Sequence, residues 1–286
     1  MFNPTTLQQM PTQLHQLCQI LQHASQILQA QYTFYCEGDD FDIIKKADQS
    51  PVTQADLLAN DFLTEQLVQL EGGYPVLSEE GDQTQRQGWG VFWMIDPLDG
   101  TKEFIKKTGE FTINLSLIQQ GESVISALAV PLKQQIYISE KGQLPYRYTW
   151  QQDDVQIDRY QKDDIQFDEQ SAIKVGVSRR LRVDGDYANF FKALDATQQA
   201  YQTVEAGSAY KFCLMLEGEI DVYPRLHGTS EWDTAAGQGL LQSIGGELFA
   251  LNGRPFLYNQ RDTLENNEFI ALRDSTAWQF YQKIIA

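Results

Sequence analysis

The chain has 286 residues, of which 42% are hydrophobic and 12% aromatic, so it is long enough for two domains and has the composition of a globular protein. Its formal net charge of −17 and its isolated basic pairs, Lys45-Lys46 and Lys106-Lys107, exclude the basic stripe that a nucleic-acid polymer requires. The same acidity would repel a phosphorylated small molecule unless bound cations reversed the charge locally, which directs attention to carboxylate clusters.

Helical periodicity marks the first part of the chain. Apolar residues recur every three or four positions over 12–31 and over 53–71, which predicts two amphipathic helices, the second ended by Gly72-Gly73. Gly121-Glu122, between two apolar runs, predicts a hairpin. Short strands are predicted at 75–77, 91–95, 112–118, 124–130 and 135–139.

The second part of the chain alternates between strands and helices. Residues 149–171, rich in Gln and Asp, predict a surface excursion near a domain boundary. Beyond them we expect strands at 173–177 and 220–223 and helices at 186–195, 208–217 and 233–243. This alternation predicts an α/β domain of residues 151–286, which follows an α+β domain of residues 1–150 along the chain.

The three cysteines, Cys18, Cys36 and Cys213, are widely spaced and form no CxxC or Cys/His pattern. They favour reduced, mostly buried thiols over disulfides or a zinc site. No basic region followed by an apolar run opens the chain, and no stretch approaches the ~18 apolar residues of a membrane span. We therefore predict a cytoplasmic protein without a transmembrane segment, and leave attachment to the inner face of the membrane open. The sequence does not decide between a monomer and a homodimer.

The most informative segment is Ile95 to Thr101, with the sequence IDPLDGT. Asp96 and Asp99 come where the predicted buried strand ends, and Pro97, which cannot extend a strand ladder, predicts a turn there. Two carboxylates at this spacing suit magnesium, although they are equally typical of a plain turn rich in Asp, Pro and Gly. Leu-Asp-Gly-Thr also occurs in phosphatases that form an aspartyl-phosphate, but Pro97 stands at the position of their nucleophile, which excludes that mechanism.

Two further carboxylate sites strengthen the metal hypothesis. Glu79-Glu80 follows an apolar run and precedes Gly81, again where a strand gives way to a loop. Asp233 stands in the segment WDTAAG at the start of a predicted helix, where on its own it would be interpreted as a helix N-cap.

Together these segments resemble the inositol monophosphatase superfamily, whose signatures are a Glu-Glu pair, Asp-Pro-[Ile/Leu]-Asp-Gly-Thr and a distal Trp-Asp-x-Ala-Ala-Gly. The resemblance runs from about residue 12 to 260, thins between 143 and 170, and is closest to the bacterial CysQ type of 3′(2′),5′-bisphosphate nucleotidase. It implies the layered α-β-α-β-α sandwich of the inositol monophosphatase and fructose bisphosphatase type. The strings that carry the finer resemblance are SPVTQAD at 50–56, VLSEE at 76–80, DPLDGTKEFIKK at 96–107, GEFTIN at 109–114, GSAYKFC at 207–213 and YPR at 223–225.

Carried over position by position, the resemblance implies two magnesium ions and a third, weak ion near Glu79. Glu79, Asp96 and the carbonyl of Leu98 would hold the first ion, and Asp96, Asp99 and Asp233 the second. Thr101, hydrogen-bonded to Asp56, would orient and deprotonate the attacking water, with Glu79 as a further catalytic residue. The amides of Gly100 and Thr101 would bind the phosphate being cleaved. The implied substrate contacts are Glu79, Leu98, Asp99, Gly100, Thr101, Ser208, Lys211, Arg225 and Asp233.

The reaction that the resemblance implies is hydrolysis of 3′-phosphoadenosine 5′-phosphate to AMP and phosphate, a lithium-sensitive step that serves sulfur assimilation. One departure bears on the nucleotide: the branch usually carries Ser-Arg-Ser-His where this chain has Ser178-Arg179-Arg180-Leu181, so a histidine is missing while Arg180 adds positive charge for a 5′-phosphate. One alternative is the same chemistry on inositol phosphates or fructose bisphosphate. Another is a silent nucleotide sensor, which is disfavoured because all the implied ligands are present.

Overall fold

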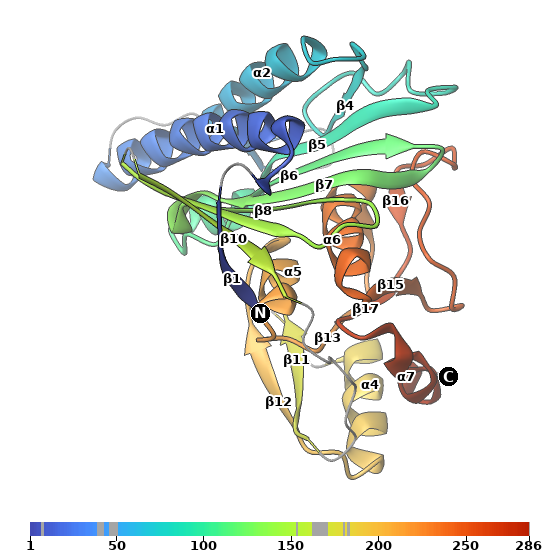
Figure 1. Ribbon diagram of the computed structural model, residues 1–286. Helices are drawn as coiled ribbons and strands as arrows, with labels where there is room; N and C mark the ends of the chain where they lie inside the picture. Colours follow the sequence, from blue (N-terminus) through green and yellow to red (C-terminus); the bar gives the residue numbers. More distant parts are fainter. Residues whose placement is uncertain are drawn as a thin grey trace.

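The computed structural model describes residues 1–6, 9–38, 43–45, 51–152, 154–161, 171–179, 181 and 184–285. Over these residues the chain forms five layers, alternately helical and β, which run from top to bottom of Figure 1. The predicted α-β-α-β-α sandwich is therefore confirmed. The helical layers are α1 (Thr12–Glu37) with α2 (Gln54–Val68), then α5 (Tyr210–Leu216) with α6 (Ala235–Ile244), and finally α4 (Gly185–Ala196) with α7 (Trp278–Ile285).

The larger sheet has eight described strands. Neighbouring strands are antiparallel, except for the parallel pair formed by the last two strands at one edge. In spatial order they are β1 (Phe2–Thr5), β10 (Asp154–Tyr160), β9 (Tyr146–Gln151), β8 (Gln135–Glu140), β7 (Glu122–Val130), β6 (Thr112–Gln119), β5 (Val91–Asp99) and β4 (Val76–Ser78). The predicted hairpin is confirmed, because Gln120 and Gly121 take φ angles of 53° and 85° and form the tight turn between β6 and β7.

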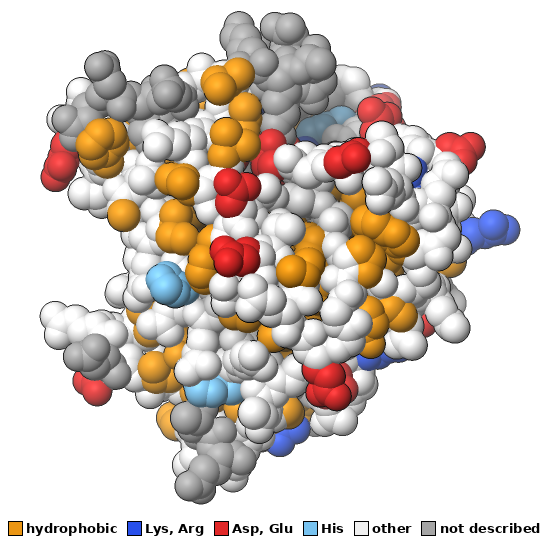
Figure 2. Space-filling view, turned by 90° about the horizontal axis from the view of Figure 1, so that it is seen from above, with side chains coloured by type: hydrophobic (Ala, Val, Ile, Leu, Met, Phe, Trp, Pro, Cys, Tyr) orange, Lys and Arg blue, Asp and Glu red, His pale blue; other side chains and the backbone are white. Residues whose placement is uncertain are grey.

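The two predicted N-terminal helices are also confirmed, and they cover the outer face of this sheet (Figure 1). Leu17, Leu21 and Leu28 of α1 and Leu63 and Leu67 of α2 are fully buried, as the apolar stripe of an amphipathic helix requires. Figure 2 views the molecule from this side, and over its described part basic side chains occur only singly. Among the described helices, none has both the length and the apolar character needed to cross a bilayer.

The prediction of a surface excursion over 149–171 is wrong for residues 149–151 and 154–160. These residues belong to β9 and β10 in the larger sheet, where Trp150, Ile157 and Tyr160 are buried. Strand residues alternate between two faces, so polar residues such as Gln151, Asp154 and Gln156 can lie exposed while the apolar ones pack. The buried Asp158 is instead paired with Arg147 at 2.7 Å. Residues 162–170 lie outside the described part of the chain.

The second sheet combines a parallel βαβ unit with antiparallel strands. Its described strands are, in spatial order, β12 (Tyr201–Glu205), β11 (Ile173–Val177), β13 (Val222–Arg225), β17 (Phe269–Leu272) and β15 (Glu247–Ala250). Strands and helices alternate along this part of the chain as expected, whereas the domain boundary at residue 150 stays a prediction. Shorter elements are β2 (Ile43–Lys45), β3 (Pro51–Thr53), α3 (Thr101–Ile105), β14 (Thr229–Ser230) and β16 (Glu265–Asn266).

The middle helical layer joins the two sheets and creates the place for a site. Buried apolar residues of β5, β7, α5, α6 and β17 form one continuous core there, including Phe92, Phe212, Leu240 and Phe269. The C-terminal end of β5, the loop before α5, the end of β13 and the turn before α6 all line one cavity beside this core.

Candidate active site

β5 does not turn at Pro97 as predicted but continues to Asp99. The ladder with β6 shifts register between Asp96 and Asp99, because a proline has no N–H to give to it. Residues three apart on a regular strand point to opposite faces, so this bulge is what lets Asp96 and Asp99 face the same cavity. The chain turns at Gly100, whose φ is 96°. A Cβ at Gly100 would lie 3.0 Å from the Glu110 carbonyl oxygen, so the close packing there requires glycine.

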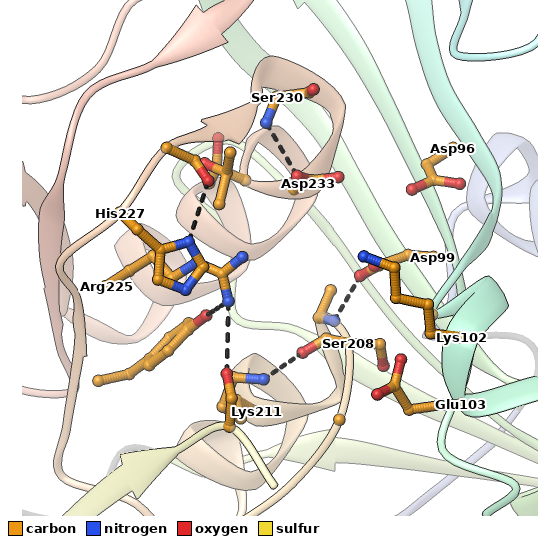
Figure 3. A pocket seen from close by; sticks show the side chains of 18 of the residues that line it. Asp96, Asp99, Lys102, Glu103, Ser208, Lys211, Arg225, His227, Ser230 and Asp233 are labelled. Carbon is orange, nitrogen blue, oxygen red and sulfur yellow. Dashed lines mark hydrogen bonds between the residues drawn. The ribbon is translucent and has the colours of Figure 1, made fainter. Parts of the chain in front are cut away.

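Three aspartates meet across the cavity, where Figure 3 shows them. Asp96, Asp99 and Asp233 each offer one carboxylate oxygen, and these oxygens lie within 4.8 Å of one another. A backbone N–H orients each carboxylate: that of Leu98 for Asp96 at 3.0 Å, that of Ala209 for Asp99 at 2.5 Å and that of Ser230 for Asp233 at 2.8 Å. Since a carboxylate has two oxygens, each aspartate can accept its N–H and still offer an oxygen to a cation.

The interpretation of Asp233 as the N-cap of the following helix is wrong. α6 begins at Ala235, and Asp233 ends a separate 3-10 turn, Glu231–Asp233. Its carboxylate accepts the N–H of Ser230 in a capping box of that turn. The side chain is thereby held toward the other aspartates and not over the first turn of α6.

The electrostatics of the cluster call for a cation. Burial, and then the charges of Glu79 and Asp99, raise the pKa of Asp96 well above its usual range. Burial also raises the pKa of Asp99, and burial together with Asp99 raises the pKa of Asp233 to about 8. Without a positive partner, Asp233 would keep its proton near neutral pH, and the other two carboxylates are pushed in the same direction. A donor set made only of crowded carboxylate oxygens fits a hard divalent cation such as magnesium.

A second feature of the site is the contact between Thr101, which lines the cavity, and the buried Asp56. The Thr101 hydroxyl lies 3.1 Å from Asp56 Oδ1 and 3.3 Å from the Leu98 carbonyl, so it can donate to either. Asp56 is buried in the first turn of α2, where its Oδ2 accepts both the N–H and the hydroxyl of Thr53. The hydrogen bond that the resemblance implied between Thr101 and Asp56 is therefore present, and Asp56 is held rigidly by its own helix cap.

The positive side of the cavity comes from the second half of the chain. Lys211 is 2% exposed, and its Nζ donates to the Ala206 and Ser208 carbonyls at 3.0 and 2.7 Å. Burial lowers the pKa of Lys211 to about 8. Arg225 Nη1 makes only long contacts of 3.4 and 3.5 Å to Ser178 Oγ and the Tyr223 hydroxyl. Within the part of the chain that the structure describes, its buried Nε has no hydrogen-bond partner.

Sequence reasoning missed the residues that tie this cavity together. Glu110 accepts from Arg179 Nε and Nη2, both at 2.5 Å, and from the Gly207 N–H at 2.8 Å. Asn114 Nδ2 lies 3.4 Å from Asp99 Oδ2 and 3.2 Å from the Trp232 carbonyl. Both belong to the string GEFTIN, but no local pattern indicates their distant partners.

The segment that departs from the nucleotidase branch is partly described. Leu181 lines the cavity, so no histidine reaches it from that position. Arg180, the predicted partner of a 5′-phosphate, lies outside the described residues, as does Ser50. The remaining predicted residues Glu79, Leu98, Gly100, Ser208, Lys211 and Arg225 line the same cavity of about 1010 Å³ as the three aspartates.

Comparison with known proteins accords with this geometry. A sequence model of the inositol monophosphatase family matches residues 10–285. The chain belongs to the inositol monophosphatase family. It is thus a phosphatase built on that family's fold.

Individual members of the family are similar over most of the chain. The 3′(2′),5′-bisphosphate nucleotidase CysQ of Escherichia coli (strain K12) is 34% identical over 259 residues, which cover 90% of this chain and 98% of that protein. The protein of the same name from Aggregatibacter actinomycetemcomitans is 37% identical over 229 residues, or 79% and 81% of the two chains. The crystal structure of CysQ from Bacteroides thetaiotaomicron has a TM-score of 0.75 and 30% identity, and the match covers 91% of this chain and 97% of that one.

Proposed function

We propose that this chain is a magnesium-dependent phosphatase that removes the 3′-phosphate of 3′-phosphoadenosine 5′-phosphate, giving AMP and phosphate. The observation that carries the proposal is the meeting of Asp96, Asp99 and Asp233 within 4.8 Å, in a cavity that is also lined by Arg225 and by Thr101, the partner of the buried Asp56. The names of the similar nucleotidases support the choice of substrate. A cytoplasmic role in sulfur assimilation follows from that choice and is part of the proposal.

In this proposal Glu79, Asp96 and the carbonyl of Leu98 hold one magnesium ion, and Asp96, Asp99 and Asp233 hold a second, with a third, weak ion near Glu79. Bound there, magnesium would supply an activated water and neutralise charge on the leaving oxygen. The protein's own part is to hold the donors before the ions arrive. The three backbone N–H contacts to the aspartates do so at fixed positions.

The attacking water is oriented by Thr101. Because Asp56 accepts the Thr101 proton, the Thr101 oxygen can accept a proton from the water. In this proposal the phosphate being cleaved is bound by the amides of Gly100, the N-cap of α3, and of Thr101, its first residue, since amides at the start of a helix have no partner within it.

The second phosphate of the substrate lies against Arg225 and Ser208. Arg225 is suited to this because its existing contacts are long and its guanidinium can grip a phosphate with two N–H groups. Lys211 contributes positive charge, while its N–H groups also hold the loop over 206–208 by its carbonyls.

A second candidate substrate is an inositol monophosphate, with the same metal chemistry. The observation in its favour is Leu181, which lines the cavity and cannot hydrogen-bond to a nucleotide. A silent nucleotide sensor is disfavoured, since it would have no physical need for the whole carboxylate cluster.

A substrate panel at fixed magnesium tests the proposal. Phosphate release from 3′-phosphoadenosine 5′-phosphate should exceed that from inositol 1-phosphate and fructose 1,6-bisphosphate in kcat/KM. A preference for inositol 1-phosphate would replace the nucleotide with the second candidate. Binding of the nucleotide without any release of phosphate would support the sensor.

A further inference from the structure

The cavity has an aromatic and apolar wall that the metal chemistry does not use. Tyr187, Leu226 and His227 contribute to it, together with Leu181. Figure 3 shows His227 beside Arg225, on the side of the cavity opposite Asp96. The cavity is thus lined by carboxylates at one end, by cationic side chains in between, and by aromatic and apolar side chains at the other end.

The ring of His227 is exposed, but its position is fixed from two sides. The Tyr187 ring packs against it edge to face, with a distance of 6.3 Å between ring centroids. The Tyr187 hydroxyl accepts the N–H of Leu226 at 3.1 Å, which anchors the backbone directly before His227. His227 Nδ1 lies 3.3 Å from the Gly228 carbonyl, so in the neutral ring Nδ1 carries the proton.

The charge state of His227 favours a flat, uncharged partner. Partial desolvation of the ring, and then the nearby Arg225, lower the pKa of His227, so the imidazole is neutral at pH 7. A neutral ring gives no charge to a phosphate, which Arg225 already serves. It offers an aromatic face and, at Nε2, a hydrogen-bond acceptor.

We propose that His227, held in place by Tyr187, determines the preference of this site for a nucleotide by stacking on the planar base of the substrate. This inference rests on the proposed function and names the feature of the substrate that the outer wall recognises. A nucleobase has a π-face for such contact, whereas an inositol ring or a bare sugar has none. His227 is a specificity-determining residue and takes no part in the hydrolysis itself.

Two variants and two substrates test this inference in the full-length, magnesium-loaded protein. The substrates are 3′-phosphoadenosine 5′-phosphate and ribose 3,5-bisphosphate, which carries both phosphates but no base. His227→Ala should lower kcat/KM for the nucleotide about 10-fold, mainly through KM, since removal of a stacking ring weakens base binding by about this much. The variant should leave the abasic substrate within about twofold of wild type. His227→Phe, which keeps a flat ring, should stay within about threefold of wild type on both substrates.

A matched control is available in the same chain. His23 is also exposed and also packs on an aromatic ring, that of Phe62 at 4.9 Å, but it lies on α1 outside the cavity. His23→Ala should change neither substrate. The affinity of each variant for AMP, measured by calorimetry, gives a readout that does not depend on turnover and should fall about 10-fold in His227→Ala.

The outcomes separate the two proposals. If wild-type protein hydrolyses the nucleotide but His227→Ala loses nothing, or loses equally on both substrates, the inference about His227 is overturned while the proposed function stands. A loss in His227→Phe as large as in His227→Ala overturns stacking as the cause. If wild-type protein is inactive on both bisphosphates, the proposed function itself fails.

Discussion

The crowding of carboxylates predicts that Asp233, a proposed metal ligand, destabilises the protein when no metal is bound. We expect Asp233→Asn to stabilise the protein in EDTA and to abolish its stabilisation by magnesium. The amide oxygen of asparagine can still accept the Ser230 N–H, which lies 2.8 Å from the carboxylate, so the local turn should survive. The variant therefore changes the charge while keeping the contact.

The magnitude follows from the pKa of Asp233, which burial and Asp99 raise to about 8 from its usual 3.8. Between these two values the folded protein binds more protons than the unfolded chain, so its stability in EDTA falls as the pH rises from about 4 to about 8. At pH 7 the full cost would be about 4 kcal/mol. Since Asp233 is partly exposed to the cavity, we expect about 1–2 kcal/mol, or a rise in Tm of about 2–6 °C.

Thermal unfolding followed by circular dichroism at pH 6, 7 and 8 measures this effect. In EDTA the Tm of Asp233→Asn should exceed that of wild type, by more at pH 8 than at pH 6. Magnesium should raise the Tm of wild type only. Asp154→Asn, at an exposed position on β10, is the control and should change nothing. A variant that is less stable than wild type in EDTA at every pH would refute the reasoning.

Three further predictions concern catalysis. Thr101→Ala should lower kcat by at least about 10- to 100-fold with little change in KM, because in the proposed mechanism its hydroxyl orients the water in the transition state; an unchanged kcat would show that another group does so. Arg225→Ala should lower kcat/KM about 10- to 150-fold for 3′-phosphoadenosine 5′-phosphate and far less for a monophosphate, with the exposed Arg254→Ala as control; equal losses would make Arg225 structural. Lithium should inhibit in an uncompetitive or mixed manner, and insensitivity at tens of millimolar, by initial-rate kinetics, would count against the nucleotidase branch.

Local sequence patterns predicted the elements that have a long, regular series of apolar residues. The helices over 12–31 and 53–71 were foreseen because their apolar stripes are long, although α1 continues to Glu37. β12 was missed because none of its residues is buried in the structure, so no apolar run marks it. β10 was missed for a related reason: its first three residues, Asp154, Val155 and Gln156, are exposed, and only one of them is apolar.

The site residues that could be predicted are those that stand within a short, recognisable sequence motif. Asp96, Asp99 and Asp233 were found from such strings, and the resemblance supplied the Thr101–Asp56 contact. The bulge at Pro97 was not foreseen, because whether a proline turns a strand or bulges it depends on the partner strand. The Glu110–Arg179 pair joins residues 69 positions apart, a contact that only the tertiary structure defines.

The central claim is that the aspartate cluster holds the magnesium needed to hydrolyse 3′-phosphoadenosine 5′-phosphate. The most direct measurement is phosphate release from this nucleotide by protein stripped with EDTA and then titrated with magnesium, beside Asp96→Asn. The account predicts no release before magnesium, saturable recovery in wild type, and no recovery in Asp96→Asn although its circular dichroism spectrum is unchanged. Full turnover in chelator, or no release from wild type at saturating magnesium, would contradict it.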